Sequence, residues 1–166
     1  MTPKEGSSVF VFDKSKKKVL LVKRRDIPIW VIPGGGIEEN EAPEKAAIRE
    51  AKEESGFDIK IIRKVAEYTH IGSDKKNHLF EARAIGGKAT INSEASAVEF
   101  FDVDNLPEMR HPLINEWLTD LNKYRKKVIK REIQGVTIRQ ALRQIHKHPI
   151  MVIRFILTRF GISINT

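Results

Sequence analysis

The segment from residue 33 to residue 57 constrains the fold more than any other part of the chain. It begins with Pro33 and three consecutive glycines, which predict an irregular loop, because proline lacks a backbone donor and glycine tolerates conformations closed to other residues. From Ala42 to Glu54 the composition changes to Ala, Glu, Lys and Arg, which favour a helix, and Gly56 follows as a C-terminal stop. The sequence therefore predicts a glycine-rich loop that leads into a charged helix.

Three glutamates, Glu50, Glu53 and Glu54, stand on this predicted helix. Positions i, i+3 and i+4 share one helix face, so the three carboxylates project into a common volume. Their repulsion is costly without a cation, and oxygen ligands of this kind suit Mg²⁺ or Mn²⁺ when a phosphate substrate completes the coordination. The alternative is a solvated acidic face beside Lys45 and Lys52, which is the commoner explanation of an isolated E-x-x-E-E pattern.

The wider spacing favours the metal site. The residues at fixed intervals are Gly35, Glu41, Arg49, Glu50, Glu53, Glu54 and Gly56. This pattern resembles the Nudix box, G-x5-E-x7-R-E-U-x-E-E-x-G-U, in which U is a bulky apolar residue. Residues 30–35, Trp-Val-Ile-Pro-Gly-Gly, are also similar to the usual approach to the box. The one departure is Ala51, which reduces the core volume beneath the helix without replacing a ligand.

The resemblance to the Nudix hydrolases, MutT-like enzymes acting on nucleoside diphosphate derivatives, implies a fold and a reaction. The fold would be an α/β/α sandwich with a mixed sheet in residues 1–131. Water would cleave a diphosphate linkage in a nucleoside diphosphate or triphosphate derivative, with Mg²⁺ or Mn²⁺ as cofactor. The implied metal ligands are Glu50, Glu53, Glu54 and the carbonyl of Gly34, oriented by Glu41 and Arg49, while Gly35 and Gly36 would bind substrate.

The general base has two candidates. Within the box, Glu53 can accept the proton from water, whereas some members of the family use a glutamate on a later loop. Glu94 stands at that place, five residues before Glu99, although it could equally be an ordinary exposed loop acid. A second function class also stays open, namely a non-catalytic sensor module that binds a nucleotide or RNA without cleaving it.

Basic and aromatic residues outside the box could select the substrate. Lys23, Arg24 and Arg25 end a predicted strand just before the glycines, where they would reach a phosphate or simply form a solvated strand end. Four weaker candidates, each with a structural alternative, are Trp30 and Tyr68 for base stacking, and His70 and His78.

Short β-rich runs alternate with turns through most of the remaining chain. Val9–Phe12 and Val19–Val22 predict a hairpin, and a third apolar run covers Ile27–Ile32. Further strands are expected at 59–66, 68–71, 78–85 and 98–103. Apolar spacing predicts a helix from Pro112 through Val128, and capping signals predict another from Thr137 to Pro149.

The charge of the chain is unevenly distributed. The net charge is +8, but residues 122–166 contain eleven Lys or Arg and one acid, while residues 1–121 contain 19 basic and 21 acidic residues. We therefore expect residues 132–166 to form a basic helical extension. It could dock on its own domain, on a second subunit in a homodimer, on an anionic membrane surface or, less favourably, on nucleic acid. The apolar run 150–160 is too short for a membrane span.

The composition also limits the chemistry and the location of the protein. The chain has no cysteine, which excludes disulfides, thiolate metal sites and cysteine nucleophiles. The first residues lack the apolar run of a secretory signal, so we expect a cytoplasmic protein, with contact to a membrane surface as an option.

Overall fold

The computed structural model of the chain describes residues 5–72, 74–124, 126–134 and 149–159. The described elements are, in chain order, β1 (Glu5–Phe12), β2 (Lys18–Arg24), β3 (Trp30–Val31), β4 (Gly34–Gly36), α1 (Pro43–Ser55), β5 (Phe57–His70), β6 (Lys76–Gly87), β7 (Ala95–Asp102), α2 (Ile114–Lys123), β8 (Ile129–Ile133) and α4 (Pro149–Arg159).

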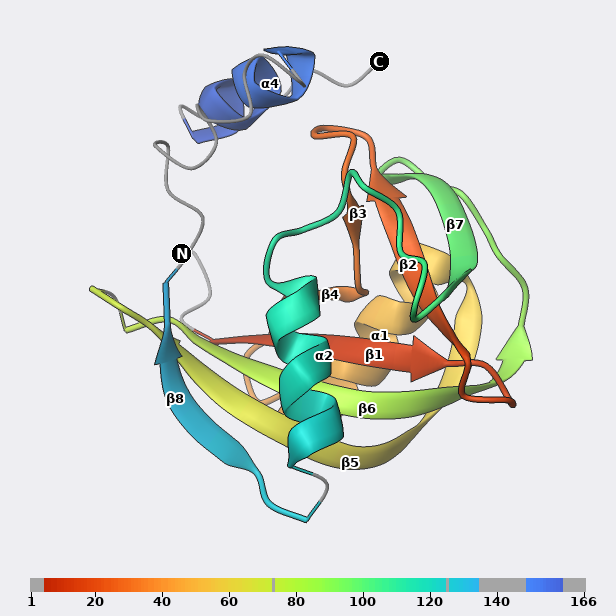
Figure 1. Cartoon of the computed structure of the whole chain (residues 1–166), viewed down its shortest axis with the longest axis vertical. Coiled ribbons are helices and arrows are strands. Elements are labelled where there is room, and N and C mark those ends of the chain that lie inside the picture. Colours follow the sequence, from red (N-terminus) through yellow and green to blue (C-terminus); the bar gives the residue numbers. More distant parts are fainter. Residues whose placement is uncertain (1–4, 73, 125, 135–148, 160–166) are drawn as a thin grey trace.

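The strands form one mixed sheet in the order β3-β2-β1-β6-β5-β8, with β4 paired to β1 and β7 paired to β2 (Figure 1). At the centre, β1 runs parallel to β6 over its whole length, and β5 is antiparallel to β6. The predicted hairpin is present, because β1 and β2 pair antiparallel with Phe12 opposite Val19. Since β1 pairs with both β6 and β4, the glycine segment lies against the middle of the molecule.

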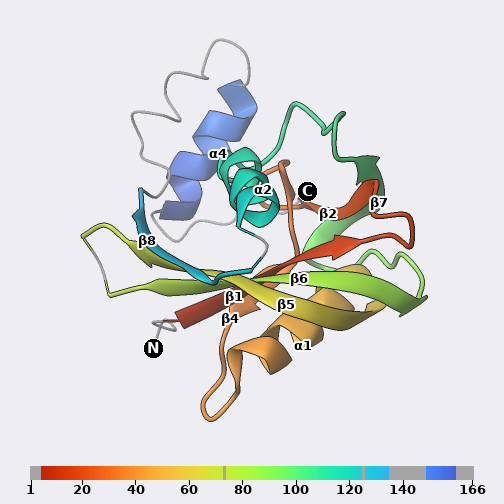
Figure 2. The ribbon, with the colours of Figure 1, turned by 60° about the horizontal axis from the view of Figure 1, so that its bottom comes forward.

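Helices α1 and α2 cover opposite faces of this sheet (Figure 2). Alternation along β1 supplies both cores, because neighbouring side chains of a strand point to opposite faces. Phe10 packs in the cluster that contains Trp117 of α2, whereas Val9 and Val11 pack in the cluster that contains Ala47 of α1. The α/β/α sandwich predicted from the sequence is therefore confirmed.

Small side chains bring α1 close to the sheet. Ala46, Ala47 and Ala51 are fully buried, and Ala51 packs in the same cluster as Val9 and Phe80. The departure from the box at residue 51 is thus a core position. The helix begins with Pro43 at its first turn and ends at Gly56, whose φ of 78° is the left-handed conformation expected of a C-terminal glycine.

The prediction of an irregular loop at residues 33–36 was wrong. Gly34–Gly36 form strand β4, which pairs antiparallel with Gly6–Ser8 of β1. The close approach explains the glycines, because a Cβ at Gly34 would collide with the backbone of Ser7 and Ser8. The apolar run before it forms only the two-residue strand β3.

The prediction of a helix from Pro112 through Val128 was also wrong at its C-terminal end. Helix α2 ends at Lys123, and Val128 lies beyond it with 44% of its surface exposed. The chain turns instead into β8, which pairs parallel with the last five residues of β5. The signal for β8 was the alternation of Ile129, Arg131 and Ile133 with exposed residues, which a helical spacing concealed.

The two strands expected at 59–66 and 68–71 are one strand, β5, which continues through Glu67. At its second half, β5 forms a polar contact with α2 and β8. The hydroxyl of Tyr68 donates a 2.7 Å hydrogen bond to Asp120, which also accepts hydrogen bonds from the guanidinium of Arg131. Strand β8 crosses the boundary that we placed between residues 131 and 132.

Helix α4 is the described helix of residues 132–166, and Figure 1 shows it at the top of the view, apart from α2. Val152 is fully buried, and Arg154 donates a 3.2 Å hydrogen bond to the carbonyl of Arg25, whereas Ile153 is 53% exposed. The helix predicted from Thr137 to Pro149 lies mostly outside the described residues. In the described part of the chain, no helix is long and apolar enough to cross a membrane.

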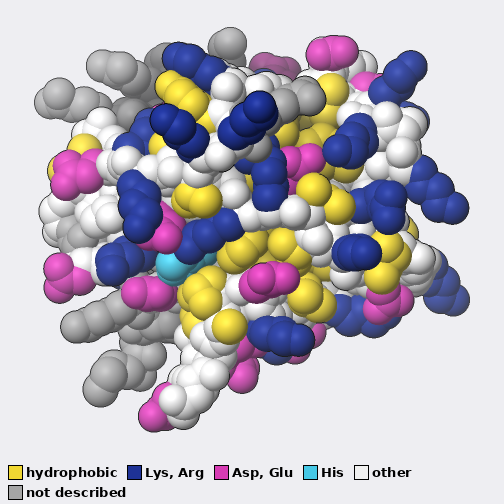
Figure 3. Space-filling view, turned by 90° about the horizontal axis from the view of Figure 1, so that it is seen from below, with side chains coloured by type: hydrophobic (Ala, Val, Ile, Leu, Met, Phe, Trp, Pro, Cys, Tyr) yellow, Lys and Arg dark blue, Asp and Glu magenta, His cyan; other side chains and the backbone are white. Residues whose placement is uncertain are grey.

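The surface carries both signs of charge. Figure 3 shows the face seen from below, where Lys and Arg side chains surround a group of hydrophobic side chains and alternate with acidic ones. Basic residues are therefore spread over the domain as well as concentrated in the C-terminal segment.

Candidate active site

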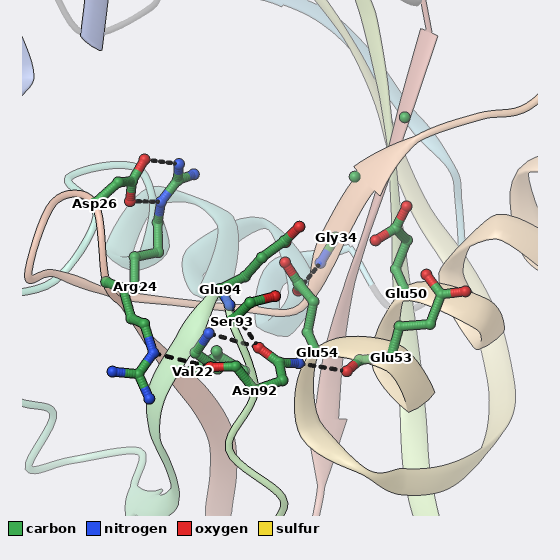
Figure 4. Close-up of a pocket in the computed structure, with 14 residues that line it drawn as sticks. Val22, Arg24, Asp26, Gly34, Glu50, Glu53, Glu54, Asn92, Ser93 and Glu94 are labelled. Atoms are coloured by element: carbon green, nitrogen blue, oxygen red, sulfur yellow. Dashed lines mark hydrogen bonds and ion pairs between the residues drawn. The ribbon is translucent and has the colours of Figure 1, made fainter. Parts of the chain in front are cut away.

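One pocket of about 690 Å³ collects most of the residues that the sequence singled out (Figure 4). Its walls come from the end of β2, strand β4, the last turns of α1 and the loop that precedes β7. The lining residues are Val22, Arg24, Arg25, Asp26, Gly34, Gly35, Gly36, Glu50, Glu53, Glu54, Asn92, Ser93, Glu94 and Ala95. The fold thus brings the three helix glutamates, the three glycines and Glu94 to the same cavity.

The glutamates of α1 reach this pocket to different depths. The side chain of Glu50 is 13% exposed, and it lies so close to β4 that a Cβ at Gly35 would overlap its carboxylate. Glu54 is partly buried and accepts a 2.9 Å hydrogen bond from the backbone N–H of Gly34. Glu53 is the outer member, with 59% of its side chain exposed. The glycines are therefore needed both for β4 and for the room that the carboxylates occupy.

Arg49 organises the acidic helix face. Its guanidinium donates two hydrogen bonds, of 2.9 and 2.8 Å, to the carboxylate of Glu41 and a third, of 3.0 Å, to the carbonyl of Gly36. The same group lies 2.8 Å from Glu50 and 3.2 Å from Glu53. The hydrogen bonds from Arg49 lower the pKa of Glu41 to about 2, so Glu41 stays ionised and holds the guanidinium in place.

The inner carboxylates have the opposite electrostatic character. The pKa of Glu54 is raised to about 7, mainly by burial, with repulsion from Glu50 and Glu94 adding to the shift and the Gly34 hydrogen bond opposing it. Burial also raises the pKa of Glu50, although Arg49 opposes the shift. Both inner carboxyl groups are therefore harder to ionise than a free glutamate.

Glu94 and Asn92 lie in the loop between β6 and β7. Glu94 and Glu54 line the same pocket, so the loop and the helix face each other, as Figure 4 shows. Sequence reasoning missed Asn92, whose side chain donates a 2.7 Å hydrogen bond to the carbonyl of Glu53. The only sequence signal was an asparagine in a polar loop, where such residues commonly stabilise turns.

The two arginines at the end of β2 line the pocket but already have protein partners. Arg24 forms a two-pronged ion pair with Asp26, and this interaction lowers the pKa of Asp26. Arg25 donates a 2.8 Å hydrogen bond from Nε to the carbonyl of Asn92. Lys23 is not among the residues that line the pocket; its Nζ lies 5.9 Å from the centroid of the Trp30 ring.

The aromatic and histidine candidates lie outside the pocket. Trp30 packs edge-on against Phe101 in the core at a centroid distance of 4.7 Å, and Tyr68 is fully buried beneath α2. His78 is buried beside Glu5, with Nε2 3.0 Å from the carboxylate, and burial lowers the pKa of His70. For Trp30, Tyr68 and His78 the structure matches the structural alternative.

Comparison with known proteins decides the family. The family model described as the NUDIX domain matches residues 2–121. The chain belongs to the Nudix hydrolase family.

Individual Nudix relatives agree with this assignment. The chain is 34% identical over 104 residues to a candidate 8-oxo-dGTP diphosphatase of Bacillus subtilis (strain 168), covering 62% of this chain and 69% of the relative. It is 35% identical over 99 residues to an ADP-ribose pyrophosphatase of Methanocaldococcus jannaschii, covering 55% and 59%. A crystal structure of an ADP-ribose pyrophosphatase from Streptococcus suis matches with a TM-score of 0.63 and 27% identity, covering 80% of this chain and all of that one.

Nudix hydrolases generally use divalent metal ions, and the donor set of this pocket fits such an ion. Carboxylate and carbonyl oxygens are the preferred ligands of hard cations, and five acidic side chains line this pocket beside two arginines. The present side-chain positions differ from a closed metal site in one respect. In the described part of the chain, no three Asp, Glu or His side chains converge closely enough to hold an ion, because Glu50 turns toward Arg49 and Glu54 toward Gly34.

Proposed function

We propose that this Nudix hydrolase is a Mg²⁺- or Mn²⁺-dependent pyrophosphohydrolase that cleaves a diphosphate linkage in a nucleoside diphosphate or triphosphate derivative by attack of water on phosphorus. The observation that carries the proposal is the convergence of Glu50, Glu53, Glu54 and Glu94 with the β4 glycines on one pocket. The names of the relatives, an ADP-ribose pyrophosphatase and a candidate 8-oxo-dGTP diphosphatase, support this substrate class and differ on the substrate itself.

The cation would be held by Glu50, Glu53, Glu54 and the carbonyl of Gly34. When bound, it would neutralise phosphate oxygens and make a nearby water more acidic. The protein's own residues orient the acidic side chains and position the substrate. Arg49 and Glu41 hold the acidic face in one orientation, and the Gly35 and Gly36 backbone allows a phosphate to approach α1 closely. Arg24 and Arg25 line the same pocket, and the guanidinium nitrogens that they do not use for Asp26 and Asn92 are suited to phosphate oxygens.

Of the two candidate bases, the contacts favour Glu94. One carboxylate oxygen of Glu53 already accepts a 3.2 Å hydrogen bond from the guanidinium of Arg49. Among the described residues, none donates a hydrogen bond to the carboxylate of Glu94, which faces the pocket across from Glu54. We therefore assign Glu94 as the base and Glu53 as a ligand.

The direct test is a substrate panel scored by released product. The wild-type protein with Mg²⁺ or Mn²⁺ should hydrolyse at least one nucleoside diphosphate derivative, whereas Glu53→Gln and Glu94→Gln should each lower kcat by about 100-fold or more. Glu44→Gln is the matched control, because Glu44 is exposed in the first turn of the same helix. No product from any member of a broad panel would refute the proposal.

The same panel separates the sensor alternative. A sensor module would show tight nucleotide binding by calorimetry in the presence of Mg²⁺ and no product over long incubation. The acidic set and the loop glutamate argue for turnover, since a binding module has no need of a base.

The other predictions, about domain division, assembly, location and partners, also stay open to test. These are the division at residue 131, a homodimer, a cytoplasmic location, and contact of residues 132–166 with a subunit, an anionic membrane surface or nucleic acid. Light scattering of the full chain would report the dimer. Co-sedimentation with anionic vesicles and with RNA would separate the two anionic surfaces.

A further inference from the structure

Asn92 connects the Glu94 loop to the metal-binding helix. Its Oδ1 accepts hydrogen bonds of 2.8 and 2.7 Å from the backbone N–H groups of Glu94 and Ala95, while its Nδ2 donates a 2.7 Å bond to the carbonyl of Glu53. These partners define the amide orientation, since two donors face the oxygen and one acceptor faces the nitrogen. One side chain thus makes three short hydrogen bonds to two elements that lie 39 residues apart in sequence.

The helix provides the acceptor for a general physical reason. The last four carbonyls of a helix have no partner within it, and Glu53 is two residues from the end of α1. The carbonyl of Lys52 is taken by the backbone N–H of Gly56. Asn92 satisfies the carbonyl of the next residue, so the loop is attached to the turn that carries Glu53 and Glu54.

The backbone of the same loop is attached on its other side to the end of β2. Arg25 donates from Nε to the carbonyl of Asn92 at 2.8 Å and from its backbone N–H to the carbonyl of Glu94 at 2.9 Å. Arg25 therefore holds the main chain of the loop at β2. At α1, the backbone N–H of Thr90 donates a 3.0 Å hydrogen bond to the carbonyl of Ser55, and the Asn92 side chain supplies the hydrogen bond to the turn that carries Glu53 and Glu54.

We propose that Asn92 is a positioning residue that sets the distance between the loop base Glu94 and the acidic face of α1. This rests on the proposed function, in which Glu94 accepts a proton from a water held near that face. Proton transfer needs the base within hydrogen-bond reach, and a displacement of about 1 Å can lower a rate by about 100-fold. Without the Nδ2 hydrogen bond, the loop keeps its attachments to β2 and, at Thr90, to the last residue of α1, but the part that carries Glu94 loses its hydrogen bond to the turn of Glu53 and Glu54 and can move away from it.

The first test is Asn92→Ala in the full-length protein, measured with the best substrate of the panel. We expect kcat to fall at least about 10-fold while KM changes less than about threefold, because the substrate contacts and the α1 ligands remain. Thr90→Ala is the matched control, since Thr90 is in the same loop but bonds only to the carbonyl of Lys88 through its side chain. An unchanged kcat in Asn92→Ala, or an equal loss in Thr90→Ala, would overturn the proposal.

A double-mutant cycle shows whether Asn92 acts through Glu94. If it does, the Asn92→Ala, Glu94→Gln double variant should be no slower than Glu94→Gln alone within about twofold, because the base that Asn92 positions is already absent. Losses that multiply would mean that Asn92 acts independently of Glu94, which contradicts the proposal.

Two further measurements need no turnover. Hydrogen exchange of residues 88–95 should speed up in Asn92→Ala, and Mg²⁺ affinity by calorimetry should stay within about twofold of the wild type. A large loss of Mg²⁺ affinity would place the effect on the helix and overturn the proposal. Failure of the proposed function is distinguishable, because a wild-type protein without activity would still show whether Asn92 holds the loop.

Discussion

The carboxylate of Glu54 accepts a 2.9 Å hydrogen bond from the backbone N–H of Gly34, a residue twenty positions earlier in the chain. This bond connects the acidic helix to the glycine strand at the point where both line the pocket. It is insufficient to offset burial, which raises the pKa of Glu54 to about 7. Ionising Glu54 therefore costs more free energy in the folded protein than in the unfolded chain, and this cost lowers the free energy of unfolding.

Glu54→Gln should stabilise the metal-free protein at pH 8. The pKa of Glu54 is about 7 in the folded state and near 4.5 when unfolded, so its contribution to stability is complete below pH 4.5 and is lost as the pH rises through 7. The loss is at most about 3 kcal/mol, and glutamine avoids it. Urea unfolding in the presence of a chelator should show the gain at pH 8 and none at pH 4.5. A gain that is the same at both pH values would contradict this explanation.

Gly35→Ala should weaken Mg²⁺ binding by at least about tenfold, because the new Cβ would displace the carboxylate of Glu50. Calorimetry on the folded variant measures the affinity directly. Gly86→Ala is the control, since a Cβ there meets only the side chain of Asp58, at an ordinary contact distance of 3.4 Å. Equal Mg²⁺ affinity in both variants would show that Glu50 does not need its present position.

Arg49→Lys should lower kcat/KM by about 10- to 100-fold although the charge is retained. An ammonium group cannot make the paired hydrogen bonds to Glu41 while also reaching Gly36 and Glu50. Lys52→Ala is a control on the same helix, because its ion pair with Asp58 joins two half-exposed side chains. Steady-state kinetics of the two variants distinguish the roles, and similar values would exclude a special function of the guanidinium.

His111 should make the protein less stable in mild acid. Burial lowers its pKa to about 4, assisted by the positive charge of Arg24, so between pH 6.5 and 4 the unfolded state binds the proton more strongly. The contribution of His111 to stability is complete above pH 6.5, falls by up to about 1.4 kcal/mol per pH unit below it, and levels off under pH 4.

His111→Gln removes this titration, so its unfolding free energy should depend less on pH between 6.5 and 4 than that of the wild type. Denaturant unfolding at pH 7, 5.5 and 4.5 measures the slope. His70→Gln provides a comparison at a less buried histidine. Parallel slopes for the wild type and His111→Gln would show that His111 is not the source.

Signals from neighbouring residues were sufficient to predict α1 and the shared face of its glutamates. The composition of residues 42–54 and Gly56 located α1 to within one residue at each end, because helix propensity and capping depend on near neighbours. The spacing of Glu50, Glu53 and Glu54 placed them on one helix face for the same reason. Short β-rich runs likewise located the second half of β1 and most of β2.

Elements that depend on distant partners were predicted less well. The glycine segment is a strand only because β1 lies beside it, and α2 ends before Val128 because residues 129–133 pair with β5. The glycine pairing leaves no mark in the neighbouring sequence, and the alternation at residues 129–133 does not say which strand it pairs with, since both pairings are decided by which strand edge is free once the sheet has formed.

The sequence by itself determined the acidic helix, the glycines that precede it and the family. The tertiary structure alone decided that the Glu94 loop faces that helix, that Asn92 bonds to the carbonyl of Glu53, and that Trp30 and Tyr68 belong to the core. The physical reason is range: helix contacts span three or four residues, whereas the contacts that complete the site join segments about 40 residues apart and form only when the whole sheet is assembled.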